Sequence, residues 1–259
     1  MKSIQEIRLE FEKADDDRLA ELFLVYGEDK RSGVVSLLRR YRRIQTMREA
    51  EETRLRIMSR FEEEYRNYKL ICGIDEVGRG PLAGPVYAGA VILPRGCHIL
   101  YINDSKKLSP ERREALSAEI YEKAVAVGIG SVSSRRIDEI NILQATYEAM
   151  RTAVRNLGIM PDILLNDAVT IPGISVRQVP IIRGDASSIS IAAASIVAKV
   201  ARDHRMEEYD REIPGYGFAA NKGYGTADHI EALKRLGPSP IHRRTFIGHF
   251  IDGGTCDGK

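Results

Sequence analysis

The stretch LICGIDEVGRGP, residues 70–81, decides the fold class of this chain. It begins with an apolar run typical of a buried strand, and two adjacent acids then lead into a glycine turn. Similar short apolar runs follow at 86–93, 125–132, 163–165 and 179–182. From 109 onward the runs alternate with helical patterns, which predicts an α/β fold whose mixed sheet carries helices on both faces.

Several element boundaries can also be predicted. Ser109 and Pro110 have the form of a helix start, and a further helix is expected to begin at or near Asn141. The segment 189–211 reads as a helix whose first half is buried. Pro180 cannot donate to a ladder, so the last strand is expected at an edge of the sheet.

Acidic side chains stand where these strands end. Asp75 and Glu76 close the first strand, Asp167 follows the run at 163–165, and Asp185 precedes the buried helix. A buried acid costs free energy unless it is paired or binds a metal, and ligands bind at the carboxyl ends of strands in open α/β sheets. Singly, each acid could be a turn or helix cap. Together, oxygen-only ligands favour Mg²⁺ or Mn²⁺, and two such ions suit phosphoryl displacement.

Residues 1–68 differ from the rest of the chain, because they contain no proline, few glycines and a high density of charge. Ser3 and Glu6 have the spacing of a capping box, and apolar residues then recur at helical spacing. We therefore expect a helical domain at 1–68 and a catalytic domain at 69–259 that ends in a helical segment. Seven cations between 30 and 48 have no acid among them, which favours a nucleic-acid-binding face over a solvated one.

Composition excludes several classes of protein. The chain has 259 residues, 39 basic against 37 acidic, and only three cysteines without metal-ligand spacing. These values argue against a disulfide scaffold and a structural zinc site. No apolar run reaches the length needed to cross a bilayer, and the first residues show no secretory signal, so we expect a cytoplasmic protein without membrane contact.

Five segments of the sequence together resemble bacterial ribonuclease HII, a type 2 ribonuclease H. These are DEVGRG at 75–80, DSKKLS at 104–109, GDA at 184–186 with SIAAASIVAKV at 190–200, NKGYGT at 221–226, and GPSPIHRR at 237–244. The resemblance covers roughly residues 70–250 in order. It implies a ribonuclease H-like mixed five-stranded sheet flanked by helices. Arg79 favours this family over ribonuclease HIII, which usually has a lysine there.

The resemblance also implies roles for single residues. Asp75, Glu76, Asp167 and Asp185 match the four catalytic, metal-binding acids of the family. Substrate-binding residues are the 2′-hydroxyl sensors Gly78, Arg79 and Gly80, together with Tyr224, which packs on the following deoxyribose; Lys106 is expected to meet phosphate. Three positions depart from the family pattern: Asn166 stands where an apolar residue is expected, and Arg183 and Ser187 where lysines are common.

The implied activity is metal-dependent endoribonuclease cleavage. The enzyme would hydrolyse RNA in RNA–DNA hybrids and incise duplex DNA 5′ of an embedded ribonucleotide, leaving a 3′-hydroxyl and a 5′-phosphate, with two Mn²⁺ or Mg²⁺ ions. Its partners would be these nucleic acids. A monomer is expected, and the tail 252–259 shows no clear docking peptide for a sliding clamp. The alternatives are a non-catalytic nucleic-acid-binding protein and another enzyme of the same fold, such as an integrase or junction resolvase, to be separated by an assay with a single ribonucleotide in duplex DNA.

Overall fold

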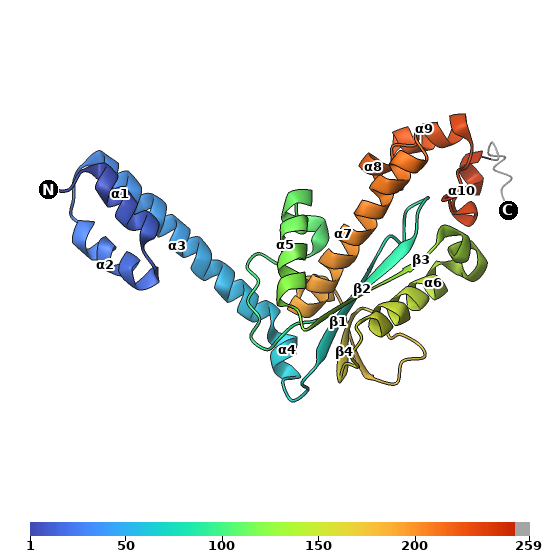
Figure 1. The fold of residues 1–259 in the computed structure, drawn as a ribbon, viewed down its shortest axis with the longest axis horizontal. Coiled ribbons are helices and arrows are strands. Elements are labelled where there is room, and N and C mark those ends of the chain that lie inside the picture. Colours follow the sequence, from blue (N-terminus) through green and yellow to red (C-terminus); the bar gives the residue numbers. More distant parts are fainter. Residues whose placement is uncertain (252–259) are drawn as a thin grey trace, which may run out of the picture. The chain divides into compact units, whose positions relative to one another are not determined.

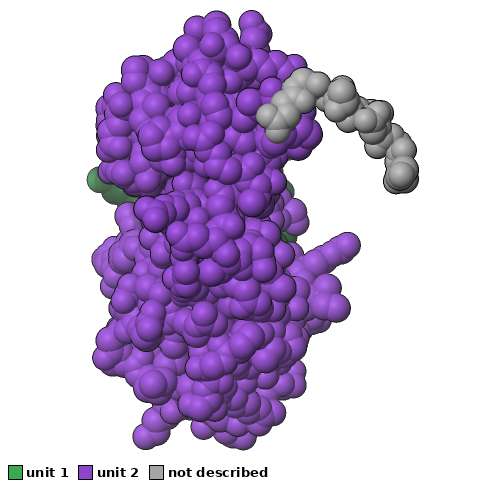
Figure 2. All heavy atoms as spheres, turned by 90° about the vertical axis from the view of Figure 1, so that its right-hand side faces the viewer, with its two compact units in different colours: residues 1–56 green, residues 57–259 purple. Residues whose placement is uncertain are grey.

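The computed structural model describes residues 1–251, which form two compact units, 1–56 and 57–251 (Figure 2). In the first unit, helices α1 (Ile4–Lys13), α2 (Asp16–Tyr26) and α3 (Ser32–Met58) form a small bundle. Its core contains Phe11, whose ring lies 4.9 Å from that of Tyr41. The predicted capping box is present, since Ser3 Oγ accepts from the Glu6 N–H and the Glu6 carboxylate accepts from the Ser3 N–H.

The basic stretch of α3 is less uniform than the sequence indicated. Arg31 pairs with Asp29, just outside the stretch, and Arg48 pairs with Asp16 and Glu52. The expectation that no carboxylate compensates the seven cations is therefore wrong for these two arginines. Five other cations are exposed and form no ion pair among residues 1–251: Lys30, Arg39, Arg40, Arg42 and Arg43.

The second unit is built on a five-stranded mixed sheet of order β3-β2-β1-β4-β5. The strands are β1 (Ile71–Val77), β2 (Val86–Ile92), β3 (Ala126–Val132), β4 (Ile163–Asp167) and β5 (Arg177–Ile181). β1 pairs antiparallel with β2 and parallel with β4. This confirms the predicted mixed sheet, and β5, which contains Pro180, lies at the edge as expected.

Helices cover both faces of the sheet (Figure 1). α6 (Ser134–Asn156) packs on one face with the core side chains of β1, β2 and β3, and α7 (Ile189–Glu212) packs on the other, with α5 (Pro110–Lys123) beside it. The short α4 (Arg60–Glu64) belongs to this unit, because Phe61 and Tyr65 pack against the core of β1, β4 and β5. The remaining elements are η1 (Ser105–Lys107), η2 (Gly184–Ala186), α8 (Phe218–Asn221), α9 (Ala227–Leu236) and α10 (Arg244–Ile251).

Two predicted helix starts have different outcomes. Ser109 caps α5 with Pro110 in its first turn, as expected. Asn141 does start a helix, because its side-chain oxygen accepts from the Leu143 and Gln144 N–H groups. It also has a φ of 65°, and a preceding helical segment from Ser134 joins the helix there at a kink. That segment was missed. None of the helices within residues 1–251 is long and apolar enough to cross a membrane.

The close approach of α7 to β1 depends on Gly73. A Cβ at this position would lie 2.1 Å from the backbone carbonyl carbon of Ser190, and backbone atoms cannot turn aside as a side chain can. The Gly73→Ala variant should therefore lose about 3 kcal/mol or more of unfolding free energy. Chemical denaturation measures this loss. Gly80→Ala is the matched control, because no atom lies within 4 Å of its Cβ, and equal losses in both variants would contradict the packing argument.

Candidate active site

Asp75 and Asp167 lie on neighbouring parallel strands. Ile74 pairs with Asn166 in the ladder between β1 and β4, and one residue further along each strand stand the two acids. Side chains alternate along a strand, so Asp75 shares the α7 face of the sheet with Gly73, and Asp167 shares it with Leu165. The two carboxyl groups therefore meet at the same end and on the same face of the sheet.

Asp185 reaches this place from η2, directly before α7. The Gly184 N–H donates to Asp167 Oδ1 at 2.7 Å, which ties the loop of Asp185 to the end of β4. Ser188 caps α7, and its hydroxyl donates to Glu62 of α4 at 2.6 Å. Glu62 also accepts from the Ser190 N–H at 3.0 Å, so α4 helps to fix the start of α7.

Negative charge accumulates where these elements meet. Burial raises the pKa of Asp75 well above its ordinary value, and the charges of Glu76 and Asp167 raise it further. Burial likewise raises the pKa of Glu76, although Arg79 opposes this effect. Burial and the charges of Asp104 and Asp167 raise the pKa of Asp185. The charge of Asp167 therefore disfavours ionisation of the other three carboxyl groups, those of Asp75, Glu76 and Asp185.

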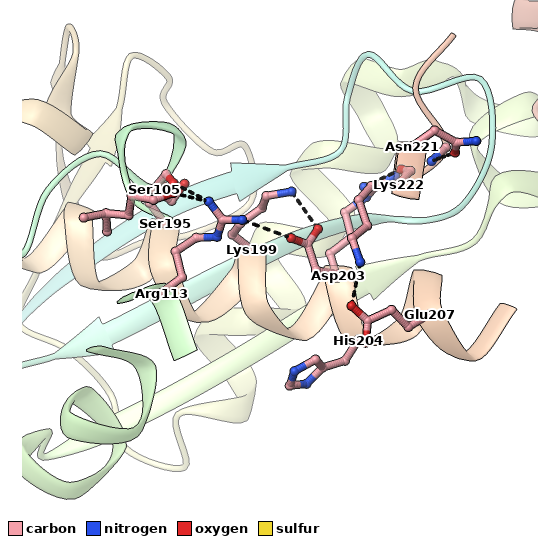
Figure 3. Close-up of polar contacts among 12 residues, drawn as sticks. Ser105, Arg113, Ser195, Lys199, Asp203, His204, Glu207, Asn221 and Lys222 are labelled. Carbon is pink, nitrogen blue, oxygen red and sulfur yellow. Dashed lines mark hydrogen bonds and ion pairs between the residues drawn. The ribbon is translucent and has the colours of Figure 1, made fainter. Parts of the chain in front are cut away.

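Lys106 of η1 is a second cation, besides Arg79, whose charge acts on this cluster. Burial opposes its charge, but the carboxylates of Asp104, Asp75, Asp185 and Asp167 raise the pKa of Lys106. The segment that carries Lys106 is held by side chains of α5 and α7. The Ser105 and Ser195 hydroxyl oxygens lie 2.9 Å apart, and Arg113 donates to the carbonyls of Ser105 and Leu108 (Figure 3).

Arg113 is itself anchored to α7. Its Nη2 lies 3.7 Å from Asp203 Oδ2, and Lys199 donates to the other oxygen of that carboxylate at 2.6 Å (Figure 3). The carboxylate of Asp203 is buried, so these two cations balance its charge. The anchor keeps the segment that carries Lys106 against the acidic end of the sheet.

The donor set fits a hard divalent cation, because it offers only carboxylate oxygens whose mutual repulsion a cation would relieve. Among residues 1–251, however, no three histidine, cysteine, aspartate or glutamate side chains are grouped closely enough to hold a metal ion as they stand. Two of the acids are engaged elsewhere: Glu76 lies 3.4 Å from the Arg79 guanidinium, and Asp167 accepts from the Gly184 N–H. Ion binding by these acids would therefore require side-chain rotations.

The predicted substrate-binding loop follows β1 directly. Gly78 has a φ of 90°, and a Cβ there would lie 2.2 Å from Arg202 Nε, so glycine is required for both backbone and space. Arg79 and Gly80 are exposed. Within residues 1–251 their N–H groups donate no hydrogen bond, which leaves two backbone donors free beside the acidic cluster.

Tyr224 lies in a second loop that joins the first one. The Leu82 N–H donates to the Gly223 carbonyl at 2.8 Å, and the Arg202 guanidinium carbon stands 5.9 Å from the centre of the Tyr224 ring. The side chain of Tyr224 is 42% exposed, so its ring is available to a ligand. The structure thus brings Tyr224 to the same region as the loop of residues 78–80.

A buried histidine pair supports the Tyr224 loop. His229 Nδ1 faces the Tyr224 carbonyl at 2.8 Å and must donate to it, so His229 Nε2 accepts from His242 Nε2 at 3.0 Å. His242 Nδ1 then accepts from Ser239, at 2.7 Å from the hydroxyl. Burial lowers the pKa of His229, and burial with the neighbouring His229 lowers that of His242 to about 4. Both rings are therefore neutral at pH 7.

Sequence reasoning missed this pair and the buried Arg202 and Arg243. His242 and Arg243 lie in the segment 237–244 on which the resemblance depends, but a motif does not show which distant loop each side chain contacts. A signal was available for Arg202, since it is an arginine in a helix that packs on the sheet and is fully buried. A buried charge of this kind indicates a specific set of acceptors.

The unusual residues near the acids have structural explanations. Asn166 points to the α6 face, away from Asp167, and its amide donates to the Val169 carbonyl and to Gln178, which orders the following loop. Arg183 has a left-handed φ of 56°, and the Ser187 hydroxyl donates to its carbonyl. These three residues shape the loops that follow β4 and β5.

Two protein-family models match the sequence of this chain. The model described as "Ribonuclease HII" matches residues 72–249, and the model described as "Ribonuclease HII N-terminal domain" matches residues 3–66. The chain belongs to the ribonuclease HII family. As a member it is a metal-dependent type 2 ribonuclease H, an endonuclease that acts on RNA–DNA hybrids.

Relatives of known name agree with this assignment. Ribonuclease HII of Lachnoclostridium phytofermentans is 62% identical over 94% of this chain and 96% of its own length. Ribonuclease HII of Enterococcus faecalis is 50% identical over 95% of each chain. Among solved structures, ribonuclease H2 of Pyrococcus horikoshii superposes with a TM-score of 0.56 at 27% identity, covering 68% of this chain and 93% of that one. The predicted ribonuclease H-like fold is thereby confirmed.

The raised pKa of Asp75 leads to a stability prediction. Its unfolded carboxyl ionises near pH 4, so the metal-free folded protein loses stability as pH rises through the higher folded value. In chelator at pH 7.5, Asp75→Asn should therefore raise the melting temperature by about 2–4 °C, as expected for ~1 kcal/mol. Thermal melts of both proteins test this prediction, and Mn²⁺ should stabilise the wild type more. A variant less stable than the wild type in chelator would contradict it.

Proposed function

We propose that this enzyme incises duplex DNA 5′ of an embedded ribonucleotide and leaves a 3′-hydroxyl and a 5′-phosphate. One observation carries the proposal: a cluster of buried carboxylates lies directly beside a loop whose exposed backbone donors are free. The carboxylates supply the chemistry of phosphodiester hydrolysis, and the loop supplies recognition of a sugar. Their closeness makes cleavage depend on which sugar occupies the loop.

Asp75, Glu76, Asp167 and Asp185 would together hold two Mg²⁺ or Mn²⁺ ions. Bound ions of this type lower the pKa of an attacking water and stabilise the charge that develops on the leaving oxygen. Lys106 faces the same cluster and is exposed, so it can approach a substrate phosphate. The raised pKa values of three of the acids support the assignment, because such shifts concentrate at functional sites.

The loop of residues 78–80 and Tyr224 would read the ribonucleotide. The 2′-hydroxyl distinguishes RNA from DNA, and glycine allows a backbone to approach a sugar closely. The exposed N–H groups of Arg79 and Gly80 can donate to the 2′-hydroxyl oxygen. The Tyr224 ring can pack on the next sugar, where an additional 2′-hydroxyl would be crowded.

The decisive experiment uses a labelled duplex with one ribonucleotide and the same duplex made only of DNA. We expect a single cut 5′ of the ribonucleotide with Mg²⁺ or Mn²⁺ and no cut in EDTA. Asp75→Asn should reduce turnover by at least ~10³-fold while binding changes little, because metal-dependent charge stabilisation is lost. End-group analysis of the products identifies the 3′-hydroxyl and 5′-phosphate.

Asp162→Asn is the control for the loss of an acid, since Asp162 lies at the other end of β4 and accepts from the Lys69 and Leu70 N–H groups. It should keep normal turnover. Full activity in EDTA, or equal cutting of the all-DNA duplex, would refute the proposal.

The helical domain would add affinity for nucleic acid. Four arginines are exposed on α3 and have no acidic partner among residues 1–251, so phosphate would relieve their mutual repulsion: Arg39, Arg40, Arg42 and Arg43. This unit holds no part of the acidic cluster. We therefore expect it to contribute sequence-independent binding rather than choice of the cleavage site.

Replacing Arg39, Arg40 and Arg43 with glutamine in the full chain should weaken duplex binding. The slope of log K against log salt should fall by roughly 0.9 for each phosphate that the variant no longer neutralises. The position of the cut should not change. The matched control replaces three other exposed cations of the same unit: Arg8, Lys13 and Arg18. An unchanged salt slope in the first variant would assign these arginines to the solvated surface.

A further inference from the structure

Arg243 is a fully buried arginine whose side-chain hydrogen bonds within residues 1–251 all go to backbone carbonyls, and its guanidinium carbon lies 5.1 Å from the centre of the Phe246 ring. Its Nη1 donates to the Arg79 carbonyl at 2.7 Å, and its Nη2 donates to the Gly78 carbonyl at 2.5 Å. Nε and Nη2 also donate to the Gly84 carbonyl, at 3.0 and 2.9 Å. A side chain near the end of the described chain thus holds both ends of the loop that follows β1.

Placing a guanidinium here is costly. Among residues 1–251 no carboxylate forms an ion pair with Arg243, and a buried cation without a counter-ion costs several kcal/mol. Burial and the neighbouring Arg202 charge lower the pKa of Arg243, which reflects this cost. The loop and the segment that carries Arg243 are already joined by two backbone hydrogen bonds, because the Arg243 N–H donates to the Leu82 carbonyl and the Gly84 N–H donates to the Ile241 carbonyl. A charged side chain is therefore not needed merely to hold the two together.

The direction of the held carbonyls has a stereochemical consequence. In a trans peptide the carbonyl oxygen and the following N–H point in opposite directions. When Arg243 binds the Gly78 carbonyl, the Arg79 N–H faces away from the guanidinium, and when it binds the Arg79 carbonyl, so does the Gly80 N–H. These are the two exposed, unbonded donors beside the acidic cluster.

We propose that Arg243 is a specificity-determining positioning residue, which holds the Arg79 and Gly80 N–H groups toward the sugar of the bound nucleotide. The inference rests on the proposed role of this loop in reading a ribonucleotide. Arg243 does not touch the substrate. Its fork of donors fixes two adjacent peptide planes at once, which a single ammonium group cannot do.

Arg202 packs against Gly78 and binds the residues that follow the loop. It donates to the Pro85, Ala83 and Lys222 carbonyls, and its Nε would clash with any side chain at Gly78. The two guanidinium groups therefore have different roles. Arg202 connects the first loop with the Tyr224 loop, whereas Arg243 is the side chain within residues 1–251 that binds the carbonyls of Gly78 and Arg79.

The test compares the affinities of Arg243→Lys for the single-ribonucleotide duplex and for the matched all-DNA duplex. Both are measured by fluorescence anisotropy with Mg²⁺ in an Asp75→Asn background, so that no turnover interferes. We expect affinity for the ribonucleotide duplex to fall roughly 3- to 10-fold, the worth of one hydrogen bond, while affinity for DNA stays constant. The control is Arg244→Lys, since Arg244 is the adjacent, exposed arginine.

The outcomes separate the two levels of the proposal. If Arg243→Lys keeps the full ribonucleotide preference, or if both affinities fall together, the positioning role is overturned and the loop proposal stands. If the parent protein shows no ribonucleotide preference, the loop proposal itself fails.

A second measurement does not depend on a stable variant. In the Asp75→Asn protein, the ¹⁵Nε resonance of Arg243 should shift when the ribonucleotide duplex binds, because the peptides that accept its hydrogen bonds then bind the sugar. The all-DNA duplex should leave it in place. Identical responses to both duplexes would overturn the proposal even if Arg243→Lys failed to fold.

Discussion

Repulsion among buried carboxylates is the constraint on which the rest of this structure depends. Parallel pairing of β1 and β4 places Asp75 beside Asp167 at one end of the sheet, and the start of α7 adds Asp185. The fold tolerates this concentration of charge by raising pKa values and by keeping Lys106 close. The same repulsion would favour binding of a divalent cation at the proposed site. Stability would then be lost at the place where the proposed chemistry requires charge.

Two buried arginines hold the two loops that we propose to bind the substrate. Arg202 and Arg243 gather the carbonyls of two loops, and His229 with His242 holds the Tyr224 loop from the other side. All four side chains come from the last quarter of the described chain. The segment after α9, which carries His242 and Arg243, therefore connects loops that are more than a hundred residues apart in sequence.

The sheet and the acids were accessible from the sequence because their signals are local. An apolar run that ends in Asp75 and Glu76 predicts both a strand and a candidate site, and Pro180 predicts the edge strand. The segment Ser134–Ile140 was missed because the left-handed Asn141 interrupts the helical period. The partner of Arg31, Asp29, lay just outside the basic stretch. The contacts of Arg243 join residues over 150 positions apart, and no local pattern encodes them.

Glu62 has a consequence for exchanging modules between relatives. The match to the family's N-terminal model extends to residue 66, whereas the compact helical unit ends at residue 56. Between these points lies α4, whose Glu62 fixes Ser188 at the start of the helix behind Asp185. A chimera joined at residue 66 would bring a relative's residue at position 62 into the unit that contains the acidic cluster. The physical joint for recombination lies earlier, within the last turns of α3.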